Sequence, residues 1–221
     1  MTTTMAPTRS TTSSTTTRPA AFTLVELLTV LAILGILAAI LVPVVGRAQE
    51  AARRTKVRTQ FAQWAAALDG FRAEYGHHPS FAAGGASSAP DLCRVNEVPG
   101  LFFQTLTGRS GTGGAPDLDR AAAANPRRIV FVAFGAAELG TGAHPSVCDD
   151  FGNTDIVLLV DRDGDGLIPA PAAPPAVLSA QTGRTLAPPP DAFPADGVRA
   201  TVAFYSAGAG RDPESVVCSW R

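Results

Sequence analysis

The distribution of apolar and polar positions divides the N-terminal third of the chain into three stretches. Residues 1–21 are rich in threonine and serine and have no apolar periodicity. Residues 22–46 are apolar apart from one carboxylate, Glu26. Beyond them, apolar residues recur at steps of 4, 3, 4, 3 and 4 positions: Val57, Phe61, Trp64, Leu68, Phe71 and Tyr75. The pattern predicts a leader without a packed fold, an apolar helix and an amphipathic helix.

The apolar run is long enough to cross a membrane. As a helix, residues 22–46 span about 37 Å, against a hydrocarbon core of about 30 Å. Sixteen of its residues are Phe, Leu, Ile or Val, and each favours insertion by roughly 0.3–0.6 kcal/mol. An ionised side chain costs about 3 kcal/mol at the bilayer centre and less near the edge, where Glu26 lies. We therefore expect a transmembrane helix, loosened at Pro43.

The amphipathic stretch continues this helix without a break signal until Gly76, which is followed by Pro79. The pattern predicts one helix of about 54 residues, near 80 Å long. Its first half is apolar on every side, whereas its second half, residues 47–76, presents one apolar face that needs a sheet to pack on.

Residues 77–221 predict a globular, β-rich domain with long Pro- and Gly-rich loops. Three β-branched, apolar segments are strand candidates: residues 128–134, 155–161 and 198–206. Leu101–Leu106 suits a short helix or turn packed on the core. The proline-rich piece 169–197 is expected to be neither strand nor helix. Strands on one long helix indicate an α+β domain.

The composition argues against nucleic-acid binding and a zinc site, and it leaves the pairing of the cysteines open. The formal net charge is −1, which argues against a nucleic-acid partner. Cys93, Cys148 and Cys218 form no C-x-x-C pair, so a zinc site is not expected. For an exported domain the simplest expectation is one disulfide and one free thiol, with all three pairings open.

The segment AFTLVELLTVLAILGILAAILVP resembles the N-terminal signature of type IV pilins and of type II secretion pseudopilins. A hydrophilic leader precedes a small residue, then Phe-Thr-Leu-x-Glu and about twenty apolar residues follow. Weaker likeness to major pseudopilins of the G-protein kind continues in LTG…NPRRIVFVAF, CDDFGNTDIVLLVDRDGDG and YSAGAGRDPESVVCSW. The resemblance implies a pilin-like fold, in which the long helix packs on a small antiparallel sheet.

The resemblance also implies a processing site. A prepilin peptidase would cut between Ala21 and Phe22 and methylate the new amine of Phe22. Glycine usually precedes the cut, so Ala21 is expected to slow cleavage. The amine would then meet Glu26 of the neighbouring subunit, because a buried carboxylate needs an opposite charge. Such a head-to-tail contact generates a helical filament. A simpler role for Glu26 is to cap the start of the helix.

The implied location is the inner membrane, with a single span and the C-terminal domain in the periplasm. Implied partners are further copies of the chain, the prepilin peptidase, minor pseudopilins and an inner-membrane assembly platform. The positive-inside rule points the other way, since five cations follow the run and two precede it. We follow the resemblance, because long domains translocate despite flanking charge. The charges then form a solvated helix face at the level of the lipid headgroups.

Asp161, Asp163 and Asp165 alternate in the sequence DRDGDGLI. Calcium prefers several oxygen ligands, which a D-x-D-x-D-G loop supplies. The glutamate that ends an EF-hand loop is missing, since Ala172 stands there. The resemblance implies calcium binding in this loop, whereas an ordinary polar turn is the alternative. Asp149, Asp150, Asp155 and Asp212 are further candidate ligands.

The sequence therefore predicts a structural subunit of a type II secretion pseudopilus and not an enzyme. Three alternatives remain: a type IV pilin of a surface fibre, an exported enzyme on an uncleaved signal anchor, and a calcium-binding adhesion module on a single span.

Overall fold

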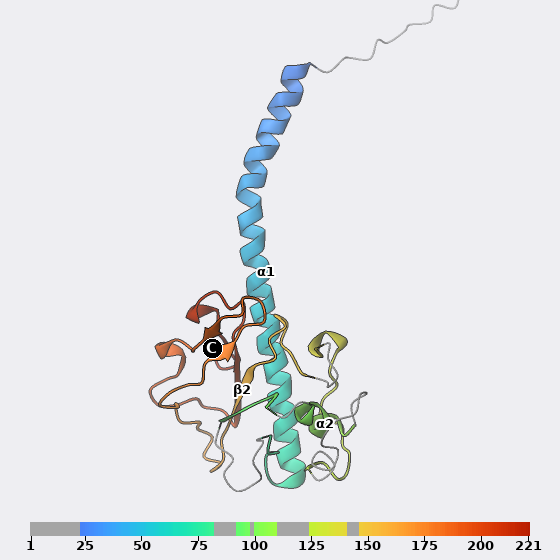
Figure 1. Ribbon diagram of the computed structural model, residues 1–221, viewed down its shortest axis with the longest axis vertical. Coiled ribbons are helices and arrows are strands. Elements are labelled where there is room, and N and C mark those ends of the chain that lie inside the picture. Colours follow the sequence, from blue (N-terminus) through green and yellow to red (C-terminus); the bar gives the residue numbers. More distant parts are fainter. Residues whose placement is uncertain (1–22, 82–91, 98–99, 110–123, 141–145) are drawn as a thin grey trace, which may run out of the picture. The chain divides into compact units, whose positions relative to one another are not determined.

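The computed structural model describes residues 23–81, 92–97, 100–109, 124–140 and 146–221 (Figure 1). Two compact units make up the chain, residues 1–46 and residues 47–221. Residues 1–22, which include the leader, lie outside the described part.

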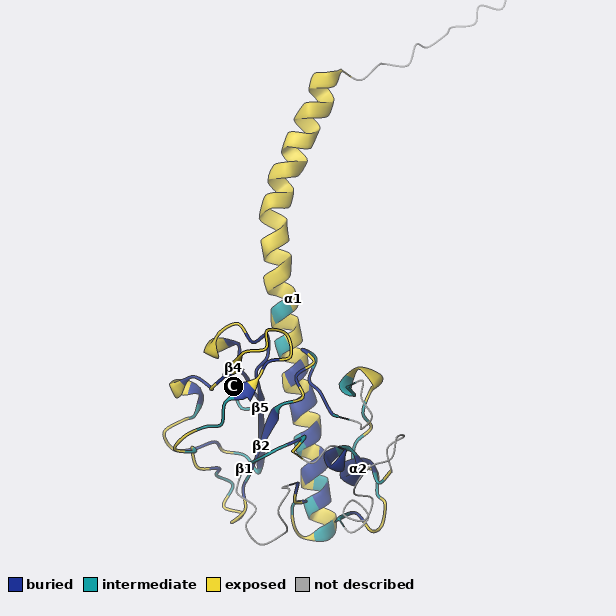
Figure 2. Cartoon of the chain, viewed as in Figure 1, coloured by how far each residue is buried: buried dark blue, intermediate teal, exposed yellow. Residues whose placement is uncertain are grey.

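One long helix, α1 (Leu24–Tyr75, 52 residues), begins in the first unit and ends in the second. The continuous helix predicted from the sequence is confirmed, and it runs through Pro43. Among the described residues, α1 is the helix long and apolar enough to cross a membrane, by length and composition. None of its apolar window is buried within the chain, as its exposed colouring in Figure 2 shows. Lipid or another protein must therefore cover this apolar stretch to keep it out of water.

The second half of α1 buries the predicted stripe except for its last residue, Tyr75, which is half-buried. Seven of its residues are buried: Val57, Gln60, Phe61, Trp64, Ala67, Leu68 and Phe71. Buried and exposed positions alternate along this part of the helix in Figure 2. The spacing of three and four residues places these side chains on one helical face, which packs into the core.

This face of α1 packs against a small antiparallel sheet. Its strand order is β1-β2-β5-β6. The strands are β1 (Leu92–Arg94), β2 (Ile156–Val160), β5 (Val202–Ser206) and β6 (Val217–Cys218). A second helix, α2 (Leu101–Thr107), adds to the same core. The α+β class is confirmed, and so is the expectation for Leu101–Leu106.

Aromatic rings join the helix to the sheet. Phe61 stacks on Phe204 of β5 at 5.5 Å between ring centroids, and Trp64 meets Phe204 edge-on at 5.7 Å. Trp64 also contacts Phe102 of α2 at 5.5 Å. Such pairs add roughly 0.5–1.5 kcal/mol each beyond burial of their area.

The opposite face of the sheet is buried as well. Val157, Leu159 and Tyr205 point into a second core cluster, formed with residues of the segment 168–198. Because both faces are covered, β2 reads as a continuous apolar run, IVLLV, and not as an alternation.

Two strand predictions were wrong. Residues 128–134 belong to no strand; among the described residues, Phe131 and Val132 donate backbone N–H groups to Leu106 O, the end of α2, and not to a strand. The segment 169–197 does contain regular structure. Strands β3 (Val177–Leu178) and β4 (Thr185–Leu186) form a hairpin, and residues 190–192 form a 3₁₀ turn. These short elements cover the second sheet face, where Val177, Leu186 and Ala192 are buried.

The expected disulfide is also absent, since all three cysteines are free thiols. Cys93 lies opposite Leu158 in β1, whereas Cys218 lies opposite Tyr205 in β6. These partners belong to the two different core clusters, so the thiols lie on opposite sheet faces and at opposite edges. Three strand spacings separate them by about 14 Å, twice the Cα distance that a disulfide bridges. Cys148 donates instead to the carbonyl oxygen of Ala137 at 3.5 Å.

We predict that the folded chain keeps three thiols even under oxidising conditions. Burial raises the pKa of Cys93 and that of Cys218 to about 12, so little reactive thiolate forms. A thiol reagent is expected to label Cys93 and Cys218 only after denaturation, as measured by mass spectrometry of the intact chain. A disulfide in the native chain would contradict this arrangement.

Candidate functional site

The first turn of α1 forms a reciprocal cap. Glu26 Oε2 accepts hydrogen bonds from the Thr23 backbone N–H at 3.0 Å and from the Thr23 hydroxyl at 2.9 Å. In return, the Glu26 backbone N–H donates to Thr23 Oγ1 at 3.2 Å. This is a capping box, in which each side chain satisfies an N–H that the helix leaves without a partner.

Within the single chain, Glu26 therefore has the simpler role that the sequence left open. Both bonds fall on one carboxylate oxygen, and the residue is exposed. A carboxylate can accept several further hydrogen bonds, so the cap leaves room for a cation. Ala21 and Phe22 lie outside the described residues, and the processing site and its amine remain predictions.

Thr23 was not predicted as the partner of Glu26. The signal was present, because Thr23-Leu24-Val25-Glu26 fits the S/T-x-x-E pattern of a capping box.

The acidic turn brings together the three predicted carboxylates. One oxygen from each of Asp161, Asp163 and Asp165 lies within 4.8 Å of the others. Asp161 is buried, and the other two are exposed. The turn follows β2 directly, so the strand fixes its first residue. Gly164 and Gly166 have φ values of +79° and +81°, which only glycine adopts without strain.

Asp161 organises the turn through its two oxygens. Oδ1 accepts the Gly164 N–H at 2.8 Å, and Oδ2 accepts the Gly166 N–H at 2.9 Å. Burial works against its charged form, but these hydrogen bonds hold the pKa of Asp161 below its ordinary value. A hydrogen bond shared with Asp161 raises the pKa of Asp163. The two carboxyl groups thus respond oppositely because only Asp161 receives two backbone donors.

The last turns of α1 are tied to the acidic turn. Arg72 Nη2 lies 2.8 Å from the point where a Gly164 side chain would begin, so the guanidinium covers this glycine. The Thr201 hydroxyl donates to Asp69 at 2.7 Å, and the Asp161 N–H donates to the Thr201 carbonyl at 2.8 Å. The turn is therefore held from both the sheet and the helix.

Three of the other candidate ligands are engaged elsewhere. Asp149 is buried and accepts bonds from Phe151, Asn153 and Ser206. Asp150 is paired with Lys56, and Asp155 with Arg94. Among the described residues, the carboxylates that could hold a metal together are those of the acidic turn. Three carboxylate oxygens suit a cation such as calcium, whose remaining ligands would have to be carbonyl or water oxygens.

A groove lies between α1 and the 3₁₀ turn at residues 136–138. Its lining includes Lys56, Asp150 and Glu138, but no serine, cysteine or histidine. Lys56 is exposed and paired with Asp150. The groove's two threonines, Thr55 and Thr59, donate their hydroxyls to backbone carbonyls of α1, so the described lining offers no hydroxyl paired with a base.

We predict that the buried Asp161 contributes more to the free energy of unfolding than the exposed Asp163 does. Asp161→Ala leaves two backbone N–H groups without their acceptor and should lower the free energy of unfolding by about 1–3 kcal/mol. Asp163→Ala, at an exposed position, should change it by less than about 0.5 kcal/mol. Denaturant titration of the full chain in detergent with a chelator present, followed by tryptophan fluorescence, measures both. Equal losses would contradict the asymmetry.

Comparison with known proteins gives one match. Residues 17–42 match the family description "prokaryotic N-terminal methylation motif". The span contains Thr23 and Glu26 and most of the apolar run. No curated protein and no solved structure matches the chain.

Proposed function

Because the chain carries the N-terminal methylation motif that marks type IV pilin-like and pseudopilin proteins, we propose that it is a filament subunit of a type II secretion pseudopilus. Prepilin peptidase cuts it between Ala21 and Phe22 and methylates the amine of Phe22. The mature subunits then polymerise through their apolar helices.

The observation that carries this proposal is the combination of an uncovered apolar helix with one acid in its first turn. Among the residues that the structure describes, seventeen large hydrophobic side chains are exposed, and all but Val130 and Leu178 lie on the helix between Leu24 and Val45. Side-by-side packing of such helices covers them but also buries Glu26. A cation must then stand near this carboxylate, and the free amine of Phe22 in a neighbouring subunit supplies it.

The contact is directional, because each subunit offers one amine and one acid. Glu26 of one copy binds the amine of the next, so the interface is heterologous and extends into a helical filament. The Thr23 cap orients the carboxylate and leaves Oε1 available among the described contacts.

The proposed location is the inner membrane, with the residues after 46 in the periplasm. The partners are other copies, the peptidase, minor pseudopilins and the assembly platform. A type IV pilus uses the same N-terminal contact, and fibres extending beyond the cell would identify that alternative. An enzyme on an uncleaved anchor finds no support in the groove lining described above.

We also propose that the acidic turn binds calcium through Asp161, Asp163 and Asp165. The support is the approach of their oxygens to within 4.8 Å and the resemblance to major pseudopilins. The ion would offset the repulsion among three carboxylates and fix the turn between β2 and the end of α1.

Glu26→Gln separates the two roles of this residue. Glutamine suits the same position of a capping box but carries no charge. We expect membrane insertion to persist, because α1 keeps its apolar run, while sedimentable filaments fall to background. The expected loss per contact is about 3–5 kcal/mol, the usual cost of removing one partner of a buried ion pair.

Thr23→Ala is the matched control, since it removes the threonine hydroxyl from the cap and keeps the charge. Filaments should still form. If Glu26→Gln assembles like the wild type in cells with an active prepilin peptidase, the residue is only a cap and the proposed contact is wrong.

Calcium binding is tested on the full chain in detergent after chelation. Saturating calcium should raise the midpoint of thermal unfolding by about 5–10 °C, from the stabilisation given by a ligand that binds only the folded state. Asp163→Asn with Asp165→Asn should abolish this rise, whereas Asp150→Asn should retain it. No rise in the wild type, or the same rise in the double variant, would contradict the site.

A further inference from the structure

The first turns of α1 in the second unit are strongly basic. Between residues 47 and 68 the helix carries five cations and a single acid, Glu50. The cations are Arg47, Arg53, Arg54, Lys56 and Arg58. All lie within 12 residues of the end of the apolar run, which corresponds to about 18 Å along the helix.

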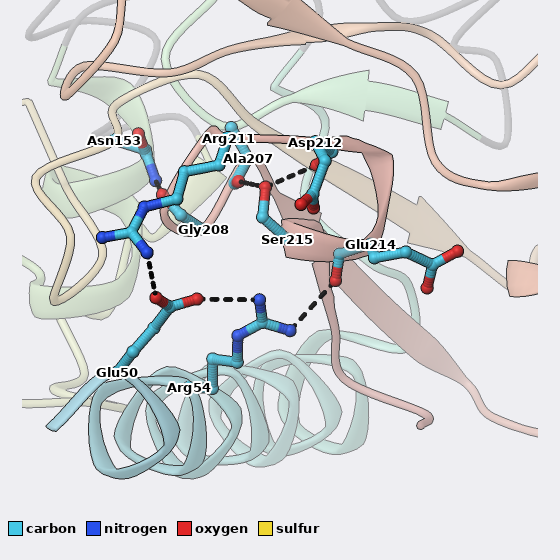
Figure 3. A network of polar contacts seen from close by, with 9 residues as sticks. All are labelled: Glu50, Arg54, Asn153, Ala207, Gly208, Arg211, Asp212, Glu214 and Ser215. Atoms are coloured by element: carbon cyan, nitrogen blue, oxygen red, sulfur yellow. Dashed lines mark hydrogen bonds and ion pairs between the residues drawn. The ribbon is translucent and has the colours of Figure 1, made fainter. Parts of the chain in front are cut away.

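The one acid of this stretch, Glu50, is already paired with two arginines, of which only Arg54 belongs to the stretch. Glu50 Oε1 accepts Arg54 Nη2 at 2.9 Å, while Glu50 Oε2 lies 3.0 Å from Arg211 Nη1. Figure 3 shows Arg54 and Arg211 converging on Glu50 from the helix and from the loop after β5. Arg54 also donates to the backbone carbonyl of Glu214 at 2.9 Å, and the Glu214 carboxylate points away from this network.

Three arginines are left without a carboxylate partner among the described residues: Arg47, Arg53 and Arg58. All three are exposed. Arg53 lies 6.0 Å from the centre of the Phe151 ring, which orients its stem but does not neutralise it. Lys56 does not belong to this set, because Asp150 pairs with it. We call Arg47, Arg53 and Arg58 the arginine collar.

We infer that the arginine collar binds the anionic phospholipid headgroups of the membrane surface next to the globular unit. The inference rests on membrane anchoring of the apolar run and not on filament assembly. A helix that leaves the hydrocarbon near Gly46 passes next through a headgroup layer about 5–8 Å thick. Arg47 lies in this layer, the long side chain of Arg53 reaches back to it, and Arg58 adds its charge at longer range. Guanidinium groups pair well with phosphate oxygens.

The size of the effect follows from the number of free cations. Near an anionic surface each Lys or Arg contributes about 1 kcal/mol, or roughly fivefold in binding. The exposed acids of the neighbouring loop, Asp212 and Glu214, reduce the local charge but lie on the loop and not on the helix. The collar also explains why cations that oppose export under the positive-inside rule are useful after export.

The experiment uses the full chain in vesicles of phosphatidylcholine, alone or mixed with phosphatidylglycerol. Flotation first establishes insertion, and phenylglyoxal then labels accessible arginines for peptide mass spectrometry. We expect labelling of Arg47 and Arg53 to slow about three- to tenfold in the anionic vesicles and that of Arg58, which lies farther from the apolar run, to slow less; all should recover at high salt. Arg127, whose side chain is 67% exposed and paired with Glu74 near the other end of α1, should label equally in both.

Replacing the collar by Arg47→Gln, Arg53→Gln and Arg58→Gln should abolish the enrichment of phosphatidylglycerol among lipids that copurify with the chain. Arg127→Gln with Arg128→Gln is the matched control and should keep it. Equal labelling of the collar in both vesicles overturns the proposal. Protection in both vesicles that resists salt also overturns it, because protein and not lipid then covers the collar. A chain that floats with neither vesicle contradicts the anchor and this proposal together, whereas loss of filaments alone leaves the collar intact.

Discussion

A carboxylate among apolar side chains is stable only where donors or a cation accompany it. Glu26 receives both of its side-chain bonds from Thr23, on one oxygen, at the start of α1, whose apolar first half is not buried by any other described part of the chain. The cap is sufficient while the first turn remains wet. The cap is insufficient once neighbouring helices or lipid remove the water, because one carboxylate oxygen then has no donor or cation beside it. This unmet need explains why a processed chain with a free amine would associate with another copy.

The globular unit buries both faces of a small sheet with few helices and strands. One face takes the aromatic stripe of α1 at Phe61 and Trp64. The other takes the proline-rich segment 168–198 through Val177 and Leu186. The ties at the two ends of the helix within this unit are polar: Glu50 with Arg54 and Arg211 at one end, and Asp69 with Thr201 at the other.

The helix was well predicted because the spacing of three and four residues that places its apolar side chains on one face can be read from the local sequence. The strands were harder. IVLLV and the β5 segment were found because both faces are buried, whereas residues 128–134 have the same composition yet pair with α2. Composition cannot distinguish these cases, since the choice depends on which partner lies alongside. The separation of Cys93 from Cys218 likewise depends on long-range strand order. The hairpin β3–β4 is a local pairing, and the prolines on either side of it concealed it. The three aspartates were placed correctly together because they are near neighbours in sequence, but Arg72 and Thr201 reach that turn only through the fold.

The proposed assembly requires that processing at Phe22 create the cation that Glu26 of the next copy needs. Mass spectrometry of the protein isolated from membranes of a cell with its own prepilin peptidase tests this most directly. We expect a chain that begins at Phe22 with a methylated amine. A mature protein in which residues 1–21 are still joined to Phe22 would contradict it, because the cation would never form.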